Sequence, residues 1–258
     1  MKVFMVAGEA SGDRLGAALI KGLCLNVPEI EFQGVAGPEM QSHGINSLFD
    51  ISELSVMGVS EILPKYRGLK RRLSQTVAAV LKFKPDVLIT IDSPDFCLRV
   101  AEAVRSADPS VRTVHYVAPT VWAWRPNRAK KMAGFIDHVL ALFPFEPTYM
   151  KAEGMDCDFV GHPIAAMPKV SSKQVTEFQE LIGLDPNRPA LVILPGSRHS
   201  EIQRLLPVFC NTLSQLDFAN LQLIFPTLPH LAALVRDHIQ ILSQDCFVVT
   251  GEGLSANE

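Results

Sequence analysis

The sequence predicts an α/β fold made of two doubly wound units, each built on a parallel sheet. Short apolar runs rich in Val, Ile and Phe alternate with helical patterns from the first residue onward. Several of these runs lack polar alternation, as expected for strands buried on both faces of a helix-covered parallel sheet. After a break without periodicity the alternation resumes, which indicates a second unit of the same class.

Five strands are predicted in the first unit, and each ends at or just before Gly, Asp or Pro. A helix is indicated by Leu69, Leu73 and Val77 at helical spacing, and Pro85 ends it before the next strand. The predicted strands are Lys2–Gly8, Glu31–Gly37, Asp86–Asp92, Thr113–Ala118 and His138–Phe143.

The predicted units span residues 1–166 and 173–258. The intervening Met167–Ser172 contains a proline, two serines and no periodicity, as is typical of a linker. Helices are expected over Gln174–Ile182 and from about Glu201 onward. Since the sequence stops just after a third strand, we expect the second sheet to be incomplete, with an exposed edge. The strands of this unit are Leu191–Leu194, Leu221–Pro226 and Phe247–Thr250.

Composition and charge exclude several classes of protein. A hydrophobic content of 48% with 20% charged residues is that of a globular protein. The formal net charge of -3 argues against wrapping of nucleic acid. The five scattered cysteines form no C-x-x-C pair, which favours reduced thiols in a cytosolic protein over disulfides or a zinc site. No stretch approaches the roughly 20 apolar residues of a membrane span, so we expect a cytoplasmic protein that at most lies on a membrane surface.

A turn with two glycines follows the first predicted strand. Gly8 and Gly12 allow a tight turn and a close backbone approach, and the following helix N-terminus favours an anion. The turn is neither a Walker A loop nor G-x-G-x-x-G. A plain turn capped by Asp13 remains an open alternative, although Glu9 is harder to explain structurally. Gly8, Ser11, Gly12 and Asp13 are the candidate substrate-binding residues of this turn, and Glu9 is a candidate catalytic residue.

Asp92 is the candidate general base. It takes the last position of a predicted strand, and ligands of open α/β sheets bind beyond the carboxyl ends of the strands. A carboxylate placed there can accept a proton from a bound substrate. The neighbouring Pro94 favours a helix start that Ser93 or Asp95 can cap, and these are structural roles.

Both tryptophans of the chain, Trp122 and Trp124, follow the strand Thr113–Ala118, and a basic stretch begins at Arg125. An aromatic ring can form the floor of a sugar site, and an arginine can bind phosphate through two parallel hydrogen bonds. Trp122 and Arg125 are therefore candidate substrate-binding residues. Core packing beside a solvated basic helix explains the same pattern and stays open.

A Gly-Ser-Arg turn between a strand and a helix predicts a diphosphate site in the second unit. Gly196, Ser197 and Arg198 together offer free backbone amides and a guanidinium group. An arginine beside a Gly-Ser turn at a helix start is costly to explain as scaffolding, so binding is the favoured interpretation.

Apolar residues beside a dense cationic cluster, between residues 54 and 72, suit a segment that lies on an anionic membrane surface. An ordinary amphipathic helix with a solvated face explains the pattern equally well. The candidate membrane-facing residues are Val56, Met57, Ile62, Leu63, Lys65, Arg67, Lys70 and Arg71.

Taken together, the motifs resemble those of the lipid-A-disaccharide synthases. Their order and spacing match over essentially the whole chain, and the GEASGD and WAWR segments are highly specific. Thr90 and Cys97 depart from the Gly and Asn that often flank the family's ID-x-PDF motif. The matching segments are AGEASGD at 7–13, VAGPEM at 35–40, IDSPDF at 91–96, HYVAPTVWAWR at 115–125, GHP at 161–163 and LPGSR at 194–198.

The resemblance implies a GT-B fold of two Rossmann-like domains, with the acceptor side in the first and the nucleotide-sugar side in the second. It implies an inverting glycosyltransferase that condenses UDP-2,3-diacylglucosamine with 2,3-diacylglucosamine 1-phosphate. The products are a β-1,6-linked disaccharide 1-phosphate and UDP. The resemblance implies no metal and no cofactor. It places the enzyme as a peripheral protein on the inner face of the bacterial inner membrane. It is also compatible with a homo-oligomer.

The resemblance also implies roles for individual residues. Asp92 falls on the position of the base that deprotonates the acceptor 6-hydroxyl, and Glu9 falls on a position that places or assists the acceptor. Arg198 falls on the arginine that offsets charge on the leaving diphosphate. Which of Asp92 and Glu9 is the base stays open.

Two alternatives accompany this expectation. The family continues past residue 258 with groups that help to hold the nucleotide, so we expect poor donor binding and slow or no turnover. The chain would then act as an inactive fragment that keeps acceptor or membrane binding. Another GT-B enzyme, such as a UDP-N-acetylglucosamine epimerase, is disfavoured by the basic-apolar segment and the WAWR run.

Overall fold

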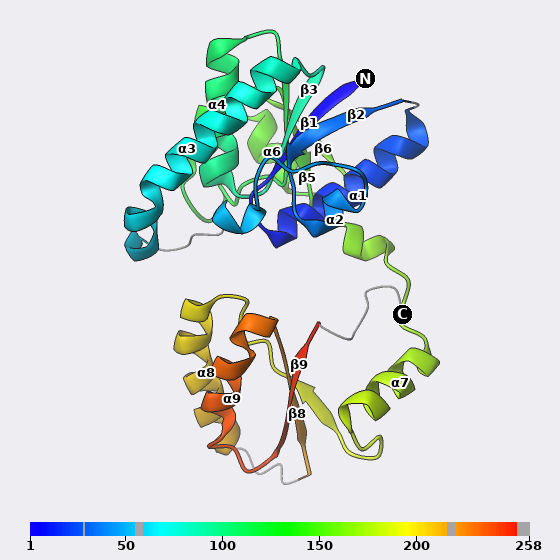
Figure 1. Cartoon of the computed structure of the whole chain (residues 1–258). Helices are drawn as coiled ribbons and strands as arrows, with labels where there is room; N and C mark the ends of the chain where they lie inside the picture. The colour runs from blue at the N-terminus through cyan, green and yellow to red at the C-terminus, as the bar shows by residue number, and fades with distance from the viewer. Residues whose placement is uncertain (28, 55–58, 216–219, 252–258) are drawn as a thin grey trace. The chain divides into compact units, whose positions relative to one another are not determined.

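The computed structural model describes residues 1–27, 29–54, 59–215 and 220–251, with the backbone alone for 59–66. The chain divides into two compact units, Met1–Met167 and Pro168–Glu258 (Figure 1). The division falls at the edge of the segment Met167–Ser172 that lacks periodicity in the sequence.

A six-stranded sheet with all neighbouring strands parallel forms the centre of the first unit, in the order β2-β1-β3-β4-β5-β6. The predicted parallel α/β fold is confirmed. The sixth strand was not predicted, because its four residues are mostly exposed and form no apolar run. The strands are β1 (Lys2–Ala7), β2 (Glu31–Val35), β3 (Val87–Ile91), β4 (Arg112–Tyr116), β5 (His138–Ala141) and β6 (Asp156–Phe159).

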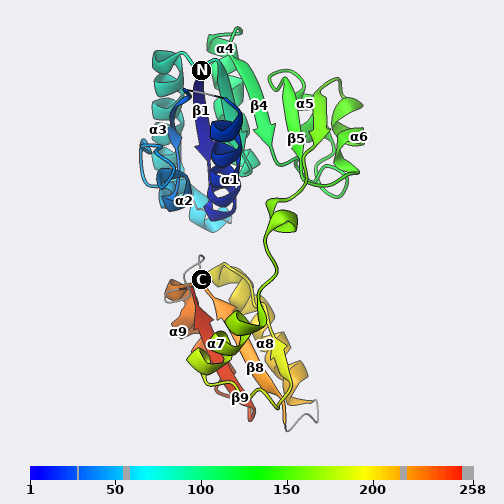
Figure 2. The same ribbon diagram turned by 90° about the vertical axis from the view of Figure 1, so that its right-hand side faces the viewer.

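Helices cover both faces of this sheet (Figure 1). Because successive side chains of a strand point to opposite faces, the fully buried Phe4 and Met5 of β1 enter two different apolar clusters. α3 and α4 pack on the Phe4 side, whereas α1 and α2 pack on the Met5 side. Figure 2 shows α5 and α6 around β5. The helices are α1 (Ala10–Asn26), α2 (Pro38–Gln41), α3 (Val59–Phe83), α4 (Pro94–Ala107), α5 (Asn127–Met132) and α6 (Glu146–Lys151), with 3-10 turns at Ile51–Leu54 and Pro163–Ala166.

The second unit holds a three-stranded parallel sheet in the order β7-β8-β9. Its core forms between this sheet and two helices, α8 and α9, with Leu206, Leu223 and Val235 fully buried. α7 buries none of its residues. The elements are α7 (Ser172–Ile182), β7 (Ala190–Val192), α8 (His199–Ser214), β8 (Gln222–Thr227), a 3-10 turn Pro229–Leu231, α9 (Ala232–Ile239) and β9 (Asp245–Thr250).

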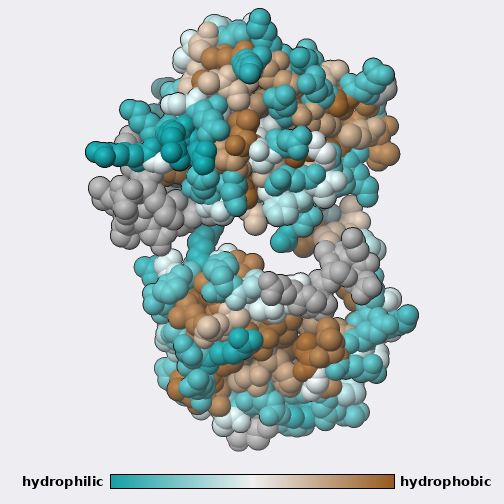
Figure 3. Space-filling view, viewed as in Figure 1, coloured by the Kyte–Doolittle hydropathy of each residue, from teal (hydrophilic) through white to brown (hydrophobic). Residues whose placement is uncertain are grey.

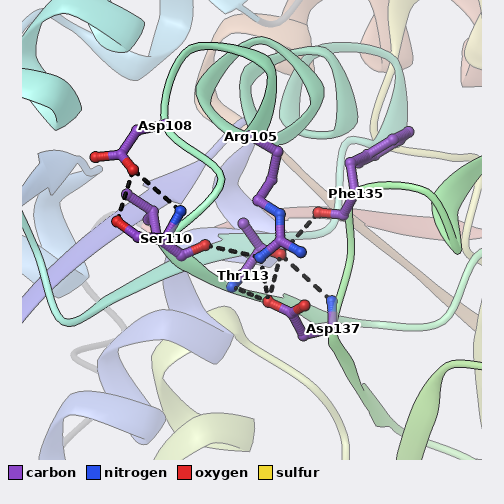
Figure 4. A network of polar contacts seen from close by, with 7 residues as sticks. Arg105, Asp108, Ser110, Thr113, Phe135 and Asp137 are labelled. Carbon is purple, nitrogen blue, oxygen red and sulfur yellow. Dashed lines mark hydrogen bonds and ion pairs between the residues drawn. The ribbon is translucent and has the colours of Figure 1, made fainter.

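A polar network ties α4 to the amino ends of β4 and β5 (Figure 4). The Asp137 carboxylate accepts hydrogen bonds from Arg105 Nη1 at 2.9 Å and from the Thr113 amide at 2.8 Å. Arg105 also donates to the Val111 carbonyl at 3.0 Å, and the Thr113 hydroxyl donates to the Phe135 carbonyl at 2.7 Å. The network therefore fixes the edge of the first unit that lies opposite the carboxyl ends of the strands.

Replacing Asp137 by alanine removes the side-chain acceptor of the Thr113 amide and one of the two acceptors of the Arg105 guanidinium. We expect the Asp137→Ala variant to lose about 1–3 kcal/mol in the free energy of unfolding. Urea unfolding followed by tryptophan fluorescence measures the first unit alone, since both tryptophans lie in it. The exposed Asp156 is the matched control, and equal losses for Asp156→Ala would contradict the assignment.

Candidate functional site

Three of the predicted site residues, Glu9, Ser11 and Asp92, lie together at the carboxyl edge of the first sheet. β1 and β3 are neighbours, with Ala7 opposite Ile91, so the loops that follow them lie side by side. Ser11 Oγ donates to Asp92 Oδ2 at 3.0 Å. Ser93 Oγ donates to Glu9 Oε1 at 3.4 Å. Hydrogen bonds between the two loops thus bring both candidate carboxylates to the same edge.

The backbone at the end of β3 is strained. Asp92 and Ser93 have φ angles of 52° and 40°, in the left-handed region that L-residues rarely adopt. Such a conformation costs roughly 1–2 kcal/mol per residue. It is held by the Asp92 amide, which donates to the Tyr116 carbonyl at 2.9 Å, and by the Ser93 carbonyl, which accepts from Cys97 at 3.0 Å. Strain of this kind is retained where the orientation of a side chain matters.

Gly8 is required by the close approach of the two loops. A Cβ added at Gly8 would lie 2.3 Å from the Cβ of Ser93 and 2.4 Å from its Oγ. At Gly12, a Cβ would lie 3.1 Å from the Ile91 carbonyl oxygen. Gly8 therefore allows contact between two loops and Gly12 allows contact between α1 and β3, whereas the sequence pattern suggested that both allow the approach of a ligand.

Asp13 is buried, and its carboxylate holds a neighbouring element. Oδ1 accepts from the amides of Gly37 at 2.9 Å and Met40 at 3.0 Å, and Oδ2 accepts from that of Glu39 at 2.9 Å. The sequence left open a cap on the helix that contains Asp13. The structure instead shows Asp13 capping α2, which links the first motif to VAGPEM.

Trp122 lies at the same edge, in an aromatic cluster that the sequence analysis did not identify. Its ring meets Phe145 edge to face at 4.9 Å and lies 6.1 Å from Tyr149. Phe143 stacks on Phe145 at 5.8 Å. Trp122 is half-buried against the core, whereas the other three rings are more than two-fifths exposed. The signal that could have found Phe143 and Phe145 is the Phe-Pro-Phe run at the end of the predicted strand His138–Phe143.

Arg125 lies on the surface near two further charged residues of this edge. It has a φ of 53°, and its guanidinium lies 5.6 Å from the centre of the Trp124 ring. Asp95 forms ion pairs with Arg125 at 3.7 Å and with Arg128 at 2.7 Å. Neither Asp95 nor Arg128 was singled out as a ligand-binding residue from the sequence.

Two buried titratable residues, His115 and Glu146, lie beneath the carboxyl edge of the sheet. The His115 Nδ1 lies 2.8 Å from the Thr90 hydroxyl, and burial, helped by the charge of Arg128, lowers the pKa of His115 to about 3. His115 is therefore neutral at physiological pH. Glu146 accepts from the amides of Leu142 and Phe143 at 2.8 and 2.9 Å, and burial raises its pKa. Glu146 thereby holds the loop that carries the exposed aromatic rings.

In the second unit the Gly-Ser-Arg turn is occupied by a carboxylate from its own helix. Glu201 Oε2 accepts from the Ser197 amide at 3.0 Å, and Oε1 pairs with Arg198 at 2.6 Å. The guanidinium of Arg198 lowers the pKa of Glu201. Gly196 has a φ of +114°, and a Cβ there would lie 2.7 Å from Glu201. The Ser197 amide, expected to be free for a ligand, thus already donates a hydrogen bond.

The candidate membrane-facing segment lies partly outside the described residues. This holds for Val56 and Met57 and for the side chains of Ile62, Leu63 and Lys65. The remaining three, Arg67, Lys70 and Arg71, are exposed on α3, where Figure 3 shows a hydrophilic surface. Within the described ranges, no helix is long and apolar enough to cross a membrane.

Replacing Asp13 by alanine removes the acceptor of three amides at the start of α2. Since each buried amide left without a partner costs about 1–3 kcal/mol, we expect Asp13→Ala to lower the free energy of unfolding by about 3 kcal/mol or more. Tryptophan fluorescence in urea measures this loss. Glu39→Ala is the control, because the network uses only the backbone amide of Glu39. A small effect of Asp13→Ala would show that the cap is dispensable.

Curated relatives of the chain are lipid-A-disaccharide synthases. Lipid-A-disaccharide synthase of Ruegeria pomeroyi is 52% identical over 241 residues, which cover 93% of this chain and 60% of that protein. The corresponding protein of Rhodospirillum centenum is 45% identical, with 92% and 60% covered. That of Rhodopseudomonas palustris strain HaA2 is 45% identical, with 97% and 64% covered. The chain thus spans less than two thirds of the length of these relatives.

Solved structures share the fold at low sequence identity. UDP-GlcNAc 2-epimerase from Neisseria meningitidis, bound to UDP-GlcNAc, matches with a TM-score of 0.68 at 14% identity, over 97% of this chain and 72% of that one. The Methanocaldococcus jannaschii epimerase, in complex with UDP-GlcNAc and UDP, matches with a TM-score of 0.62 at 14% identity, over 97% and 73%. At such identities the likeness shows the fold alone, which is the GT-B-like α/β class expected from the sequence.

The family is shown by the match of a family model rather than by these structures. The model described as lipid-A-disaccharide synthetase matches residues 3–249, which include every predicted site residue of both units. With that match and the identity of its curated relatives, the chain belongs to the lipid-A-disaccharide synthetase family.

Proposed function

We propose that the chain transfers 2,3-diacylglucosamine from its UDP derivative to the 6-hydroxyl of 2,3-diacylglucosamine 1-phosphate. The products are the β-1,6-linked disaccharide 1-phosphate and UDP. The observation that carries the proposal is Asp92, held in a strained conformation at the carboxyl edge and bonded by Ser11. The family and the position of Asp92 beyond a strand end support the same reaction.

Asp92 acts as the general base in this proposal. Ser11 bonds Oδ2, while Oδ1 accepts no hydrogen bond from the described residues and so remains able to take the acceptor proton. As the proton leaves, the acceptor oxygen attacks the anomeric carbon from the face opposite UDP. The bond from that carbon to UDP breaks, UDP keeps the electron pair, and the configuration inverts. No metal or cofactor takes part in this proposal.

Glu9 positions the acceptor rather than taking its proton. Its carboxylate accepts a hydrogen bond from Ser93, and its backbone lies in extended conformation at the start of α1. The strain at Asp92 and its bond to Ser11 favour Asp92 as the base, because they fix one carboxylate in one direction.

Arg198 stabilises the leaving group in the second unit. Glu201 orients its guanidinium through an ion pair at 2.6 Å. A cation held in place in this way offsets the negative charge that builds on the diphosphate as the glycosidic bond breaks.

The exposed cations Arg67, Lys70 and Arg71 of α3 support a peripheral location on an anionic membrane surface. Each such cation near anionic lipid contributes about 1 kcal/mol of attraction. The inner face of the bacterial inner membrane is the proposed location, because the acyl chains of the proposed substrates partition into a membrane. A homo-oligomer remains an expectation from the family.

A second candidate function is acceptor binding without transfer. The observation that favours it is the Ser197 amide, which donates to Glu201 rather than standing open to a diphosphate. In this case the first unit would bind the acylated sugar phosphate, while the second unit would hold the donor weakly.

The Asp92→Asn variant tests the base. It keeps the shape and an acceptor for Ser11 but cannot take the proton, so we expect the rate of disaccharide formation to fall about 10²–10⁴-fold. Transfer from UDP-diacylglucosamine to diacylglucosamine phosphate is measured by product mass, with Asp156→Asn at the opposite edge as the control. If Asp92→Asn kept full activity and Glu9→Gln were inactive, Glu9 rather than Asp92 would be the base. Lipid binding without product from the unmodified chain would favour the second candidate function.

A further inference from the structure

An open groove of about 690 Å³ lies between α4 and the segment that includes α5. Pro94 and Asp95, which begin α4, line one end of it. They follow Asp92 by two and three residues, so the groove begins within one helical turn of the proposed base. None of the site residues expected from the sequence, apart from Arg125, lines this groove.

The groove carries an excess of positive charge. Four cations line it, namely Arg99, Arg125, Arg128 and Lys131, against two carboxylates, Asp95 and Glu102. The difference between four and two leaves a formal charge of +2. An excess of this size attracts an anion more strongly than an isolated surface arginine does.

Two of the four cations, Arg125 and Arg128, form ion pairs with Asp95, and the other two, Arg99 and Lys131, remain available to bind an anion. Asp95 pairs with Arg128 at 2.7 Å and Arg125 at 3.7 Å, which places both guanidinium groups near the start of α4. Arg99 and Lys131 are exposed and form no ion pair with any residue that the structure describes. They can therefore donate to an anion without first losing a partner.

The rest of the groove is apolar. Leu98 and Met132, which are almost completely buried, contribute to its floor, and Pro94, Pro126 and Phe135 complete its walls. Charged heads above an apolar floor suit a ligand that joins an anionic group to a less polar body. A freely soluble inorganic anion would make no use of this floor.

We infer that the groove binds the phosphate monoester of the acylated acceptor, through Arg99 and Lys131 together with the arginines that Asp95 holds. This inference rests on the proposed function, since it assigns a place to one group of the proposed substrate. A phosphate monoester carries about −1.5 to −2 charges at neutral pH, which matches the excess in the groove better than a phosphodiester headgroup does. A glucosamine with its 6-hydroxyl at Asp92 directs its 1-phosphate away from that carboxylate, and the groove is the cationic surface that begins beside it.

The backbone at Arg125 supports the inference independently of charge. Arg125 has a φ of 53° although it is not glycine, at the point where the chain enters the groove wall. Strain of this kind persists where the surrounding structure serves a function. Here it places a guanidinium between Trp124 and Asp95.

The Arg99→Gln/Lys131→Gln double variant of the full chain tests the groove by direct binding. The probes are short-chain diacylglucosamine 1-phosphate and the same lipid without its phosphate. We expect affinity for the phosphorylated lipid to fall about tenfold or more, since charge-assisted hydrogen bonds are lost. Affinity for the dephosphorylated lipid should change less than about twofold. The control is Lys130→Gln/Arg112→Gln, which removes the same charge from exposed positions outside the groove.

The pH dependence gives a second readout. Because the second pKa of a phosphate monoester is about 6, the unmodified chain should bind the phosphorylated lipid more tightly at pH 7.5 than at pH 5. The double variant, which keeps Arg125 and Arg128, should show a smaller gain, whereas a site for phosphodiesters would show no gain at all.

Three results would overturn the inference. One is an equal loss of affinity in the control variant, and another is the absence of any preference for the phosphorylated lipid. The third is loss of binding to phosphatidylglycerol vesicles with unchanged affinity for the acceptor, which would make the groove a membrane-docking surface. If the chain bound the phosphorylated lipid preferentially but formed no disaccharide, the result would contradict the proposed reaction and still support phosphate binding by the groove.

Discussion

The geometry of the site depends on the close approach of the loops that follow β1 and β3. Gly8 permits it, because any Cβ there would meet Ser93 at 2.3 Å. With the loops in contact, Ser11 reaches Asp92 and Ser93 reaches Glu9. The left-handed backbone of Asp92 and Ser93 is the energetic cost of this contact, roughly 1–2 kcal/mol per residue. The large apolar clusters on both faces of the sheet can sustain such a cost.

The Asp13 carboxylate couples the glycine turn after β1 to the start of α2. Asp13 follows the glycine turn on α1 and bonds three amides around the start of α2, so that two sequence motifs form one unit. Substitutions in either motif should therefore act together rather than additively. Farther along the same edge, the Glu146 carboxylate accepts hydrogen bonds from backbone amides of the loop that carries Phe143 and Phe145, and so holds that loop in place.

Apolar runs and strand-end positions were sufficient to predict the fold class, five strands of the first sheet and the gathering of Glu9, Ser11 and Asp92 at one edge. Strand β6 escaped because its four residues form no apolar run. The left-handed conformation of Asp92 could not be predicted from the sequence, because an aspartate adopts this conformation only occasionally. The partners of Asp13 lie 24–27 residues away, and only the fold brings them together. Glu201 lay beside a predicted motif, but which group its carboxylate contacts depends on the backbone at Gly196.

The ion pair and hydrogen bond of Glu201 have a consequence for anion selectivity. An anion that uses the Ser197 amide competes with a carboxylate that is already tethered there by its own helix. A singly charged ion replaces one negative charge by another and gains little. A diphosphate brings more charge and more acceptor oxygens, and can engage Arg198 as well as the amide. Under the proposed function, the turn would therefore favour a multiply charged ligand over simple, singly charged anions.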